Sequence, residues 1–235
     1  MAEKLKSISR QIHWSLLLRA AVFALAWFFF PFWLFFLVAL YLYFVPLFQA
    51  GAFVIPFFVV LVLAFIHAPS VLFALALGAI FYYLLLIKDL LLIDRVAAYE
   101  LLVLVLSFFL FREFYQSFGS GFAGGALWFA SLIAALFGLL MNSFIKFTLD
   151  PEGGGIRRPA VLLSLLAVWQ FLVLGLFLPL DFIYQSVIVF LIAVLVVDLV
   201  PEYCLHGPVR SKIFATSTVV FAFLVLILAS ARWGI

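Results

Sequence analysis

The sequence contains very little charge and only one cysteine. Charged residues make up 10% of the 235 residues, whereas soluble domains average about 25%. This scarcity excludes a soluble globular protein, and no feature of the sequence supports nucleic-acid binding. The single cysteine, Cys204, cannot form a disulfide within the chain, so the cysteine content does not indicate a redox compartment.

The chain is instead rich in hydrophobic and aromatic side chains. Hydrophobic residues make up 70% of it, with 32 Phe, and the mean hydropathy is +1.40. Long apolar runs are separated by short polar turns, and the polar alternation of a membrane barrel is missing. We predict one all-α domain over residues 1–235, a polytopic transmembrane helical bundle surrounded by the lipid bilayer of the plasma membrane.

The hydrophobic pattern predicts nine short spans, two of them separated by a proline. Residues 16–49 are too long for a single helix of about 20 residues, and Pro31 disfavours helix at the residue before it. Trp27 and Trp33 flank this break, as interfacial aromatic residues do. The nine spans are expected at residues 15–30, 32–48, 53–66, 70–87, 96–112, 122–146, 160–178, 183–199 and 212–231.

The distribution of Lys and Arg predicts the orientation of the chain. With nine spans, the N-terminus and the turns after the fourth, sixth and eighth spans lie on one side of the membrane. All 13 Lys and Arg residues except Arg112 and Arg232 fall on that side. Because Lys and Arg are enriched in cytoplasmic turns, we expect the N-terminus inside and the C-terminus outside.

Two stretches of the sequence are similar to each other. The run LVLVL is followed by the tripeptide Tyr-Gln-Ser at Tyr115, and the run LVLGL is followed by the same tripeptide at Tyr184. One interpretation is a duplicated helical hairpin, in which residues 96–146 are repeated as residues 160–199. The alternative is coincidence in a chain composed largely of Leu, Val, Phe and Ala.

The sixth span carries a stripe of small residues. Residues four apart stay on one slowly drifting face of a helix, and small residues there let a neighbouring helix come close in lipid. We therefore expect this helix, over residues 119–146, to be the most tightly packed of the bundle. The residues predicted to make the contact are Gly121 and Gly125, which form a GxxxG motif, and Ala126, Ala130, Ala134 and Gly138.

Polar residues concentrate in three patches on the predicted inner side, the first at residues 88–100. Glu100 lies about one turn inside the fifth span, and an ionised carboxylate costs about 2.5–3.5 kcal/mol at a helix centre. It therefore needs a partner or a proton, and Lys146, at the matching depth of the sixth span, is the expected ion-pair partner. The alternatives are a ligand or proton site, which would make Glu100 a catalytic candidate, and exposure at the interface.

The second patch, residues 146–158, joins a glycine-rich turn to two arginines. Backbone N–H groups at a helix start and guanidinium groups both suit a phosphate or an anionic lipid headgroup. Gly154, Arg157 and Arg158 are the predicted contacts. The alternative is an ordinary cytoplasmic turn, because neither a Walker sequence nor a preceding strand accompanies the glycines.

The third patch, residues 198–212, holds Asp198 and Glu202. These two lie one turn apart if the helix continues, although Pro201 argues against continuity. Asp198 is the second catalytic candidate, for metal binding or proton transfer. Their spacing matches no known metal motif, and we predict no metal site. Further carboxylates that could in principle assemble with them around Mg²⁺ are Asp89, Asp94, Glu100 and Asp150.

No catalytic motif is recognisable, so the sequence leaves three functions open. The first is a scaffold, partner subunit or small facilitator without chemistry of its own. The second is a membrane-embedded enzyme that acts on a phosphorylated lipid at the cytoplasmic leaflet. The third is a small-molecule transporter, which the lack of ionisable groups through the middle of the spans disfavours. The sequence does not identify a cofactor, and the expected partners are anionic lipid or other membrane subunits.

Overall fold

A computed structural model describes residues 14–45, 50–89, 94–118, 124–148, 154–206 and 210–230, and the side chains of residues 50, 154–157, 205 and 206 are not among those described. Of these residues 91% are helical and none is in a strand. The prediction of an all-α fold is therefore confirmed. The chain divides into two compact units, Met1–Ala98 (unit 1) and Tyr99–Ile235 (unit 2).

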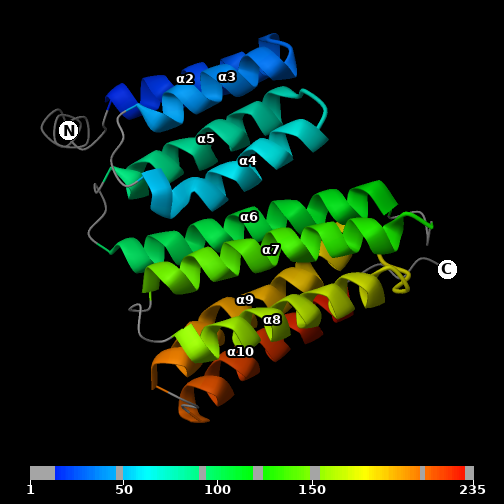
Figure 1. The fold of residues 1–235 in the computed structure, drawn as a ribbon. Helices are drawn as coiled ribbons and strands as arrows, with labels where there is room; N and C mark the ends of the chain where they lie inside the picture. Colours follow the sequence, from blue (N-terminus) through cyan, green and yellow to red (C-terminus); the bar gives the residue numbers. More distant parts are fainter. Residues whose placement is uncertain are drawn as a thin grey trace, which may run out of the picture. The chain divides into compact units, whose positions relative to one another are not determined.

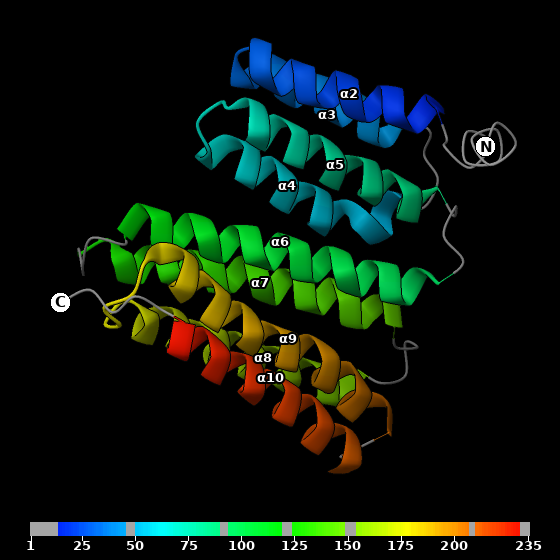
Figure 2. The same ribbon diagram turned by 180° about the vertical axis from the view of Figure 1, so that it is seen from behind.

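Unit 1 is built from two helical hairpins and ends in the first turn of a further helix. In both views α2 lies beside α3, and α4 lies beside α5 (Figures 1 and 2). Helix α2 also packs on α5. The elements are α2 (Trp14–Phe29), α3 (Phe32–Phe44), the 3₁₀ turn η1 (Ala50–Phe53), α4 (Val54–Ile66), α5 (Val71–Lys88) and the start of α6 (Arg95–Phe118).

The helix ends of unit 1 follow from local side chains. Pro31 occupies the N-cap of α3 in an extended conformation and separates α3 from α2, which confirms the predicted break. At the start of α5 the Ser70 hydroxyl accepts a hydrogen bond from the Phe73 amide, and at the start of α6 the Asp94 carboxylate accepts one from the Ala97 amide. Both satisfy amides that lack a partner inside the helix.

The core of unit 1 is aromatic. The rings of Phe23 and Phe81 stack at 4.1 Å between α2 and α5, and those of Tyr43 and Phe57 stack at 4.1 Å between α3 and α4. Gly78 lets α5 approach α2 closely, since a Cβ there would lie 3.1 Å from Cβ of Ala24. These contacts bring the four helices together as one packed unit.

Unit 2 contains the rest of α6 and four further helices. They are α7 (Ala126–Thr148), α8 (Gly154–Gly175), α9 (Phe182–His206) and α10 (Arg210–Ser230). Helix α8 packs on both α7 and α9, and α10 packs on α9 (Figure 2). Helix α6 joins this group through the ring contacts Phe111–Phe137 with α7 and Phe108–Phe190 with α9.

The length and composition of the described helices are compatible with a multi-pass membrane protein. Five of the helical stretches are long and apolar enough to cross a bilayer, and three shorter ones are also apolar. The five are Val71–Lys88, Ala126–Thr148, Arg158–Gly175, Phe182–Cys204 and Arg210–Ser230, and the three are Trp14–Phe29, Phe32–Phe44 and Gly51–Ile66. In α10 only 6% of the apolar window is buried, so most of its residues keep exposed surface although the helix packs on α9.

Three helices extend beyond their predicted ends. Helix α6 continues to Phe118, α8 already begins at Gly154, and α9 continues through Pro201 to His206. The glycine-rich turn predicted before the seventh span is therefore partly helix, with Pro159 inside it. Glycine and proline lower helix propensity without forbidding a helix, because packing on neighbouring helices can offset their local cost.

The two similar stretches do not occupy equivalent positions. The run LVLVL and Tyr115 both lie in α6, whereas Tyr184 lies in α9, beyond the turn that ends α8. The sequence similarity therefore does not place the two tyrosines at the same point of a helical hairpin. The duplication of residues 96–146 as 160–199 stays a prediction.

The small-residue stripe of α7 lies inside unit 2. Ala126, Ala130 and Ala134 have no exposed surface, and a Cβ on Gly138 would lie 2.9 Å from a terminal methyl of Leu165 on α8. Gly125 differs, because the helix begins only at Ala126. It is exposed in the preceding turn, where a Cβ would meet no atom within 4 Å, so it makes no packing contact. Gly121 lies outside the described residues.

Candidate functional site

Asp198 and Glu202 lie on one face of α9, one helical turn apart. The helix continues past Pro201, so the interruption suggested by the proline does not occur. Residues four apart on a continuous helix project in nearly the same direction. The two carboxylates are therefore held side by side by the backbone of a single helix.

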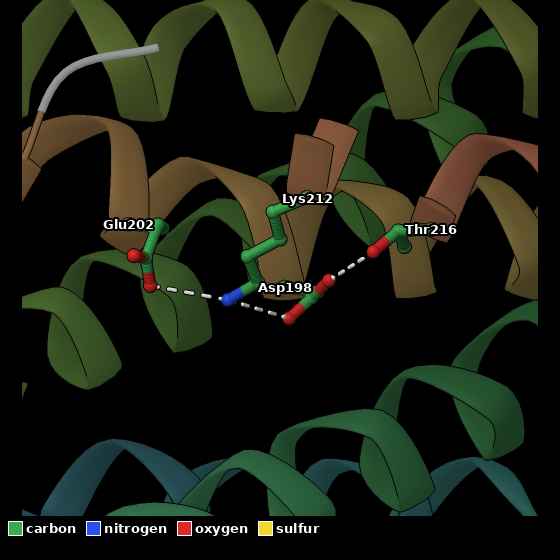
Figure 3. A network of polar contacts seen from close by, with 4 residues as sticks. All are labelled: Asp198, Glu202, Lys212 and Thr216. Carbon is green, nitrogen blue, oxygen red and sulfur yellow. Dashed lines mark hydrogen bonds and ion pairs between the residues drawn. The ribbon is translucent and has the colours of Figure 1, made fainter. Parts of the chain in front are cut away.

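Lys212, in the first turn of α10, contacts both carboxylates. Its Nζ lies 3.2 Å from Oδ1 of Asp198 and 3.1 Å from Oε2 of Glu202. Thr216, one turn further along α10, donates a hydrogen bond of 2.7 Å to Oδ2 of Asp198. Figure 3 shows the ammonium between the two carboxylates and the threonine hydroxyl on the other side of Asp198. This network fastens α10 to α9.

The ammonium balances half of the negative charge of the network. Two carboxylates and one ammonium leave a net charge of about −1 when all three are ionised, instead of −2 for the acids alone. The side chains are partly accessible, with exposed fractions of 36% for Lys212, 26% for Asp198 and 32% for Glu202. Charged groups in a membrane-embedded helix are costly unless they are paired in this way. The catalytic candidate Asp198 thus has both carboxylate oxygens engaged.

A groove between α8, α9 and α10 opens beside this network. Its volume is about 350 Å³, and Glu202, Tyr203 and Lys212 line it together with apolar side chains such as Leu163 and Val196. Ser164 also lines the groove, but its hydroxyl donates to the carbonyl of Ala160 within α8 at 2.7 Å. The groove therefore combines apolar walls with one ion pair, Glu202–Lys212, and this combination suits an amphiphile.

Two exposed arginines are close in sequence to residues that line the groove. Arg158 precedes Ala160, which lines the groove, by two residues, and Arg210 precedes Lys212 by two residues. Helix α8 begins at Gly154, as the proposed anion contact requires, but no side chain is described for Arg157. The three residues predicted to hold a phosphate group, Gly154, Arg157 and Arg158, remain untested in that role.

The expected ion pair between Glu100 and Lys146 stays a prediction. Glu100 is half-buried on α6, and Lys146 is exposed near the end of α7. The contact that joins the two helices next to Glu100 is between its neighbour Tyr99 and Ser143, whose hydroxyl accepts a hydrogen bond of 2.7 Å from the tyrosine. Tyr99 is fully buried, and nothing in its sequence neighbourhood identified it as a bonding partner of a serine 44 residues away.

Unit 1 contains a buried cation, Lys88, which in the sequence served only to predict the orientation of the chain. Lys88 is fully buried, with Nζ 3.2 Å from Oδ1 of Asp89 and 5.6 Å from the centre of the Tyr43 ring. In a separate contact, the guanidinium of Arg95 at the start of α6 lies 5.9 Å from the centre of the Phe53 ring. The adjacent Lys-Asp pair was a visible signal, but Tyr43 and Phe53 are far from it in sequence. These cation–π contacts join α5 to α3 and the start of α6 to η1.

Within the described ranges, no group of three or more His, Cys, Asp or Glu side chains is arranged to hold a metal ion. Asp150 lies outside those ranges. Asp198 and Glu202 contact an ammonium, and Asp94 caps the start of α6.

No protein-family model, curated protein or solved structure matches this chain. The site must therefore be interpreted from its own geometry.

Proposed function

We propose that this protein is a non-enzymatic multi-pass membrane protein, a small partner subunit or facilitator that holds an amphiphile in the α8–α9–α10 groove. The observation that carries the proposal is the contact of Lys212 with both Asp198 and Glu202 at the edge of an apolar groove. The ammonium and the Thr216 hydroxyl occupy both oxygens of Asp198, so neither is directed at a ligand in the groove as a general base would have to be. The ion-paired side chains serve well as a fixed polar end for a bound amphiphile.

The surface of α10 supports a role as partner subunit. Away from the face that packs on α9, its apolar side chains are exposed, including Phe214, Phe221 and Leu226, with exposed fractions of 76%, 67% and 63%. An exposed apolar helix surface of this kind packs against lipid or against other membrane helices. We further propose that all nine described α-helices cross the plasma membrane, with the N-terminus inside and the C-terminus outside, since that arrangement satisfies the positive-inside rule.

A second candidate function is an enzyme that acts on a phosphorylated lipid at the cytoplasmic leaflet. It is favoured by the exposed cations Arg158 and Arg210, each of which precedes a groove-lining residue by two positions in the sequence. Guanidinium groups bind phosphate in a bidentate manner. Under this hypothesis the apolar walls of the groove would hold the acyl chain, and the two arginines would hold the phosphate group.

Native mass spectrometry of the gently extracted protein tests the proposal. We expect wild type to retain an amphiphile or a protein subunit. If the arginines bind a phosphate group, the double variant Arg157→Ala/Arg158→Ala loses a phospholipid that the control Arg112→Ala keeps, since Arg112 lies on the side predicted to be opposite. Wild-type protein that carries neither lipid nor subunit would contradict the proposal.

Prolonged incubation of the lipid-bound protein separates the two candidate functions. A non-enzymatic protein leaves the mass of the retained lipid unchanged. Conversion of the lipid by wild type but not by Asp198→Asn, with both proteins equally stable, would replace the first candidate with the enzyme. Lipid that remains unchanged in both would support the partner or facilitator function.

A further inference from the structure

A second pocket lies in unit 1, at the end where α2 and α4 finish. The α2–α3 turn and the α4–α5 turn are at this same end (Figures 1 and 2). The volume of the pocket is about 200 Å³. Six aromatic side chains line it, and we name it the aromatic pocket: Trp27, Phe30, Phe32, Phe35, Phe65 and His67.

The rings of the aromatic pocket are held at angles to one another. Phe32 meets Phe65 in a T-shaped pair with ring centres 4.9 Å apart, and it is inclined by 49° to Phe35. Trp27 is fixed by a hydrogen bond of 2.8 Å from its Nε1 to the carbonyl of Ala64. Rings that are inclined to one another leave space between them, whereas parallel rings would stack in direct contact.

The charge of this end comes from neither ionised carboxylates nor the helix termini. Helices α2 and α4 end beside the pocket, but α3 and α5 begin at the same end, so two positive helix N-termini offset two negative C-termini. Among the described residues of unit 1, the Asp, Lys and Arg side chains lie toward the other end: Arg19, Lys88, Asp89, Asp94 and Arg95.

These features suit a cation of one particular kind. Aromatic ring faces attract positive charge, but the described pocket offers no carboxylate to replace the water shell of a strongly hydrated ion. A quaternary ammonium group is weakly hydrated and surrounded by methyl groups, so it loses little on leaving water. We propose that the aromatic pocket binds a quaternary ammonium group. This proposal is independent of the groove in unit 2.

The burial of the rings distinguishes this pocket from an ordinary interfacial aromatic belt. In a belt, Trp and Phe side chains point outward into the headgroup layer, as Trp33 does with an exposed fraction of 64%. Trp27 and Phe35 are instead buried, with exposed fractions of 5% and 0%, and they form the inner wall of the pocket. A space lined by buried rings and open between exposed ones is a site that a ligand can enter.

The first experiment compares ligands of equal shape. Tetramethylammonium and its uncharged analogue 3,3-dimethylbutan-1-ol are added to the purified full-length protein, and the unfolding temperature is followed. We expect saturable stabilisation by tetramethylammonium, with a dissociation constant on the order of 1–10 mM, and at least about tenfold weaker stabilisation by the neutral analogue and by potassium. Equal effects of the cation and the neutral analogue would overturn the proposal.

Variants locate the effect in the pocket. Phe65→Leu should weaken tetramethylammonium binding by about fivefold to tenfold, and its exposed fraction of 68% means that the substitution leaves the fold intact. Phe32→Tyr keeps a ring and should keep binding. The matched control is Phe29→Leu, an exposed residue of α2 that does not line the pocket. Binding that survives Phe65→Leu unchanged, or is lost equally in Phe29→Leu, would contradict the proposal.

The quaternary ammonium can belong to a lipid headgroup or to a free small molecule. In nanodiscs of phosphatidylcholine, a lipid headgroup in the pocket would compete with tetramethylammonium and weaken its binding relative to nanodiscs of phosphatidylglycerol. A free ligand would bind equally in both and would be displaced by soluble choline. Absence of tetramethylammonium binding in phosphatidylglycerol nanodiscs as well as in detergent would overturn the proposal for both sources.

Discussion

The hydroxyl of Tyr115 lies against Cα of Gly175. Tyr115, on α6, donates a hydrogen bond of 2.8 Å to the carbonyl of Leu172 on α8. One turn along α8, a Cβ added to Gly175 would overlap this hydroxyl and lie 2.8 Å from Cζ of the ring. The glycine at the end of α8 thus makes room for the tyrosine that joins α6 to α8.

Gly175→Ala should therefore lower the stability of unit 2. The new methyl must displace a fully buried ring, and we expect a loss of about 1–3 kcal/mol in the free energy of unfolding. Thermal unfolding in detergent measures it. The matched control is Gly124→Ala, because a Cβ at Gly124 meets no atom within 4 Å. Equal stability of the two variants would show that the Tyr115 contact does not constrain the helix pair.

Removal of the ammonium from the α9–α10 network should destabilise the protein. Lys212→Met leaves Asp198 and Glu202 side by side without a counter-charge, at a cost of about 1–3 kcal/mol. The control Arg210→Met removes an exposed cation two residues away and should change little. The triple variant Lys212→Met/Asp198→Asn/Glu202→Gln should recover stability, since no uncompensated charge remains. Failure of the triple variant to recover would mean that electrostatics are not the cause.

The stripe of small residues on α7 predicts a contrast between neighbouring alanines. Ala134 is fully buried and Ala135 is exposed. Ala134→Leu should force α7 away from its neighbours and cost several kcal/mol, or prevent assembly, whereas Ala135→Leu should be tolerated. Yield of folded protein and the unfolding temperature both report the difference. Normal stability of Ala134→Leu would contradict the close packing of this helix.

Cysteine labelling tests the proposed topology. Cys204, the single cysteine, is half-buried near the end of α9, and a membrane-impermeant maleimide should reach it only from the cytoplasmic side. The matched probe is Gly125→Cys in a Cys204→Ser background, because Gly125 is exposed in the turn between α6 and α7. This probe should label only from outside. Labelling of both positions from the same side would exclude the proposed arrangement of spans.

Local features of the sequence predicted the fold better than the site. Pro31 separates two helices because a proline restrains the residue before it whatever the surroundings. Pro201 does not interrupt α9, although a proline inside a helix costs about 3 kcal/mol. Beyond it, Glu202 gains a contact with Lys212 from another helix, and such tertiary gains are not visible in a local pattern.

The polar contacts of the structure show the same limit. Tyr99 and Ser143, and Lys88 and Tyr43, meet only because helices far apart in sequence pack together. Position along the chain predicted the depth of Glu100 in its helix but not the partners that surround it. Asp198 and Glu202 were recognisable as a pair from their spacing of four residues. Lys212, whose ammonium contacts both of them, was not recognisable as their partner.

The lengths of the helices set a hydrophobic mismatch with the bilayer. Helix α3 has 13 residues and α2 has 16, which at 1.5 Å per residue match about 20 and 24 Å of hydrocarbon, whereas a typical bilayer core is about 30 Å thick. Helix α9, with 25 residues, is long enough to cross that core at a tilt. If α2 and α3 cross the bilayer as proposed, the lipid beside them must thin, so lipids with short acyl chains should gather around these two helices.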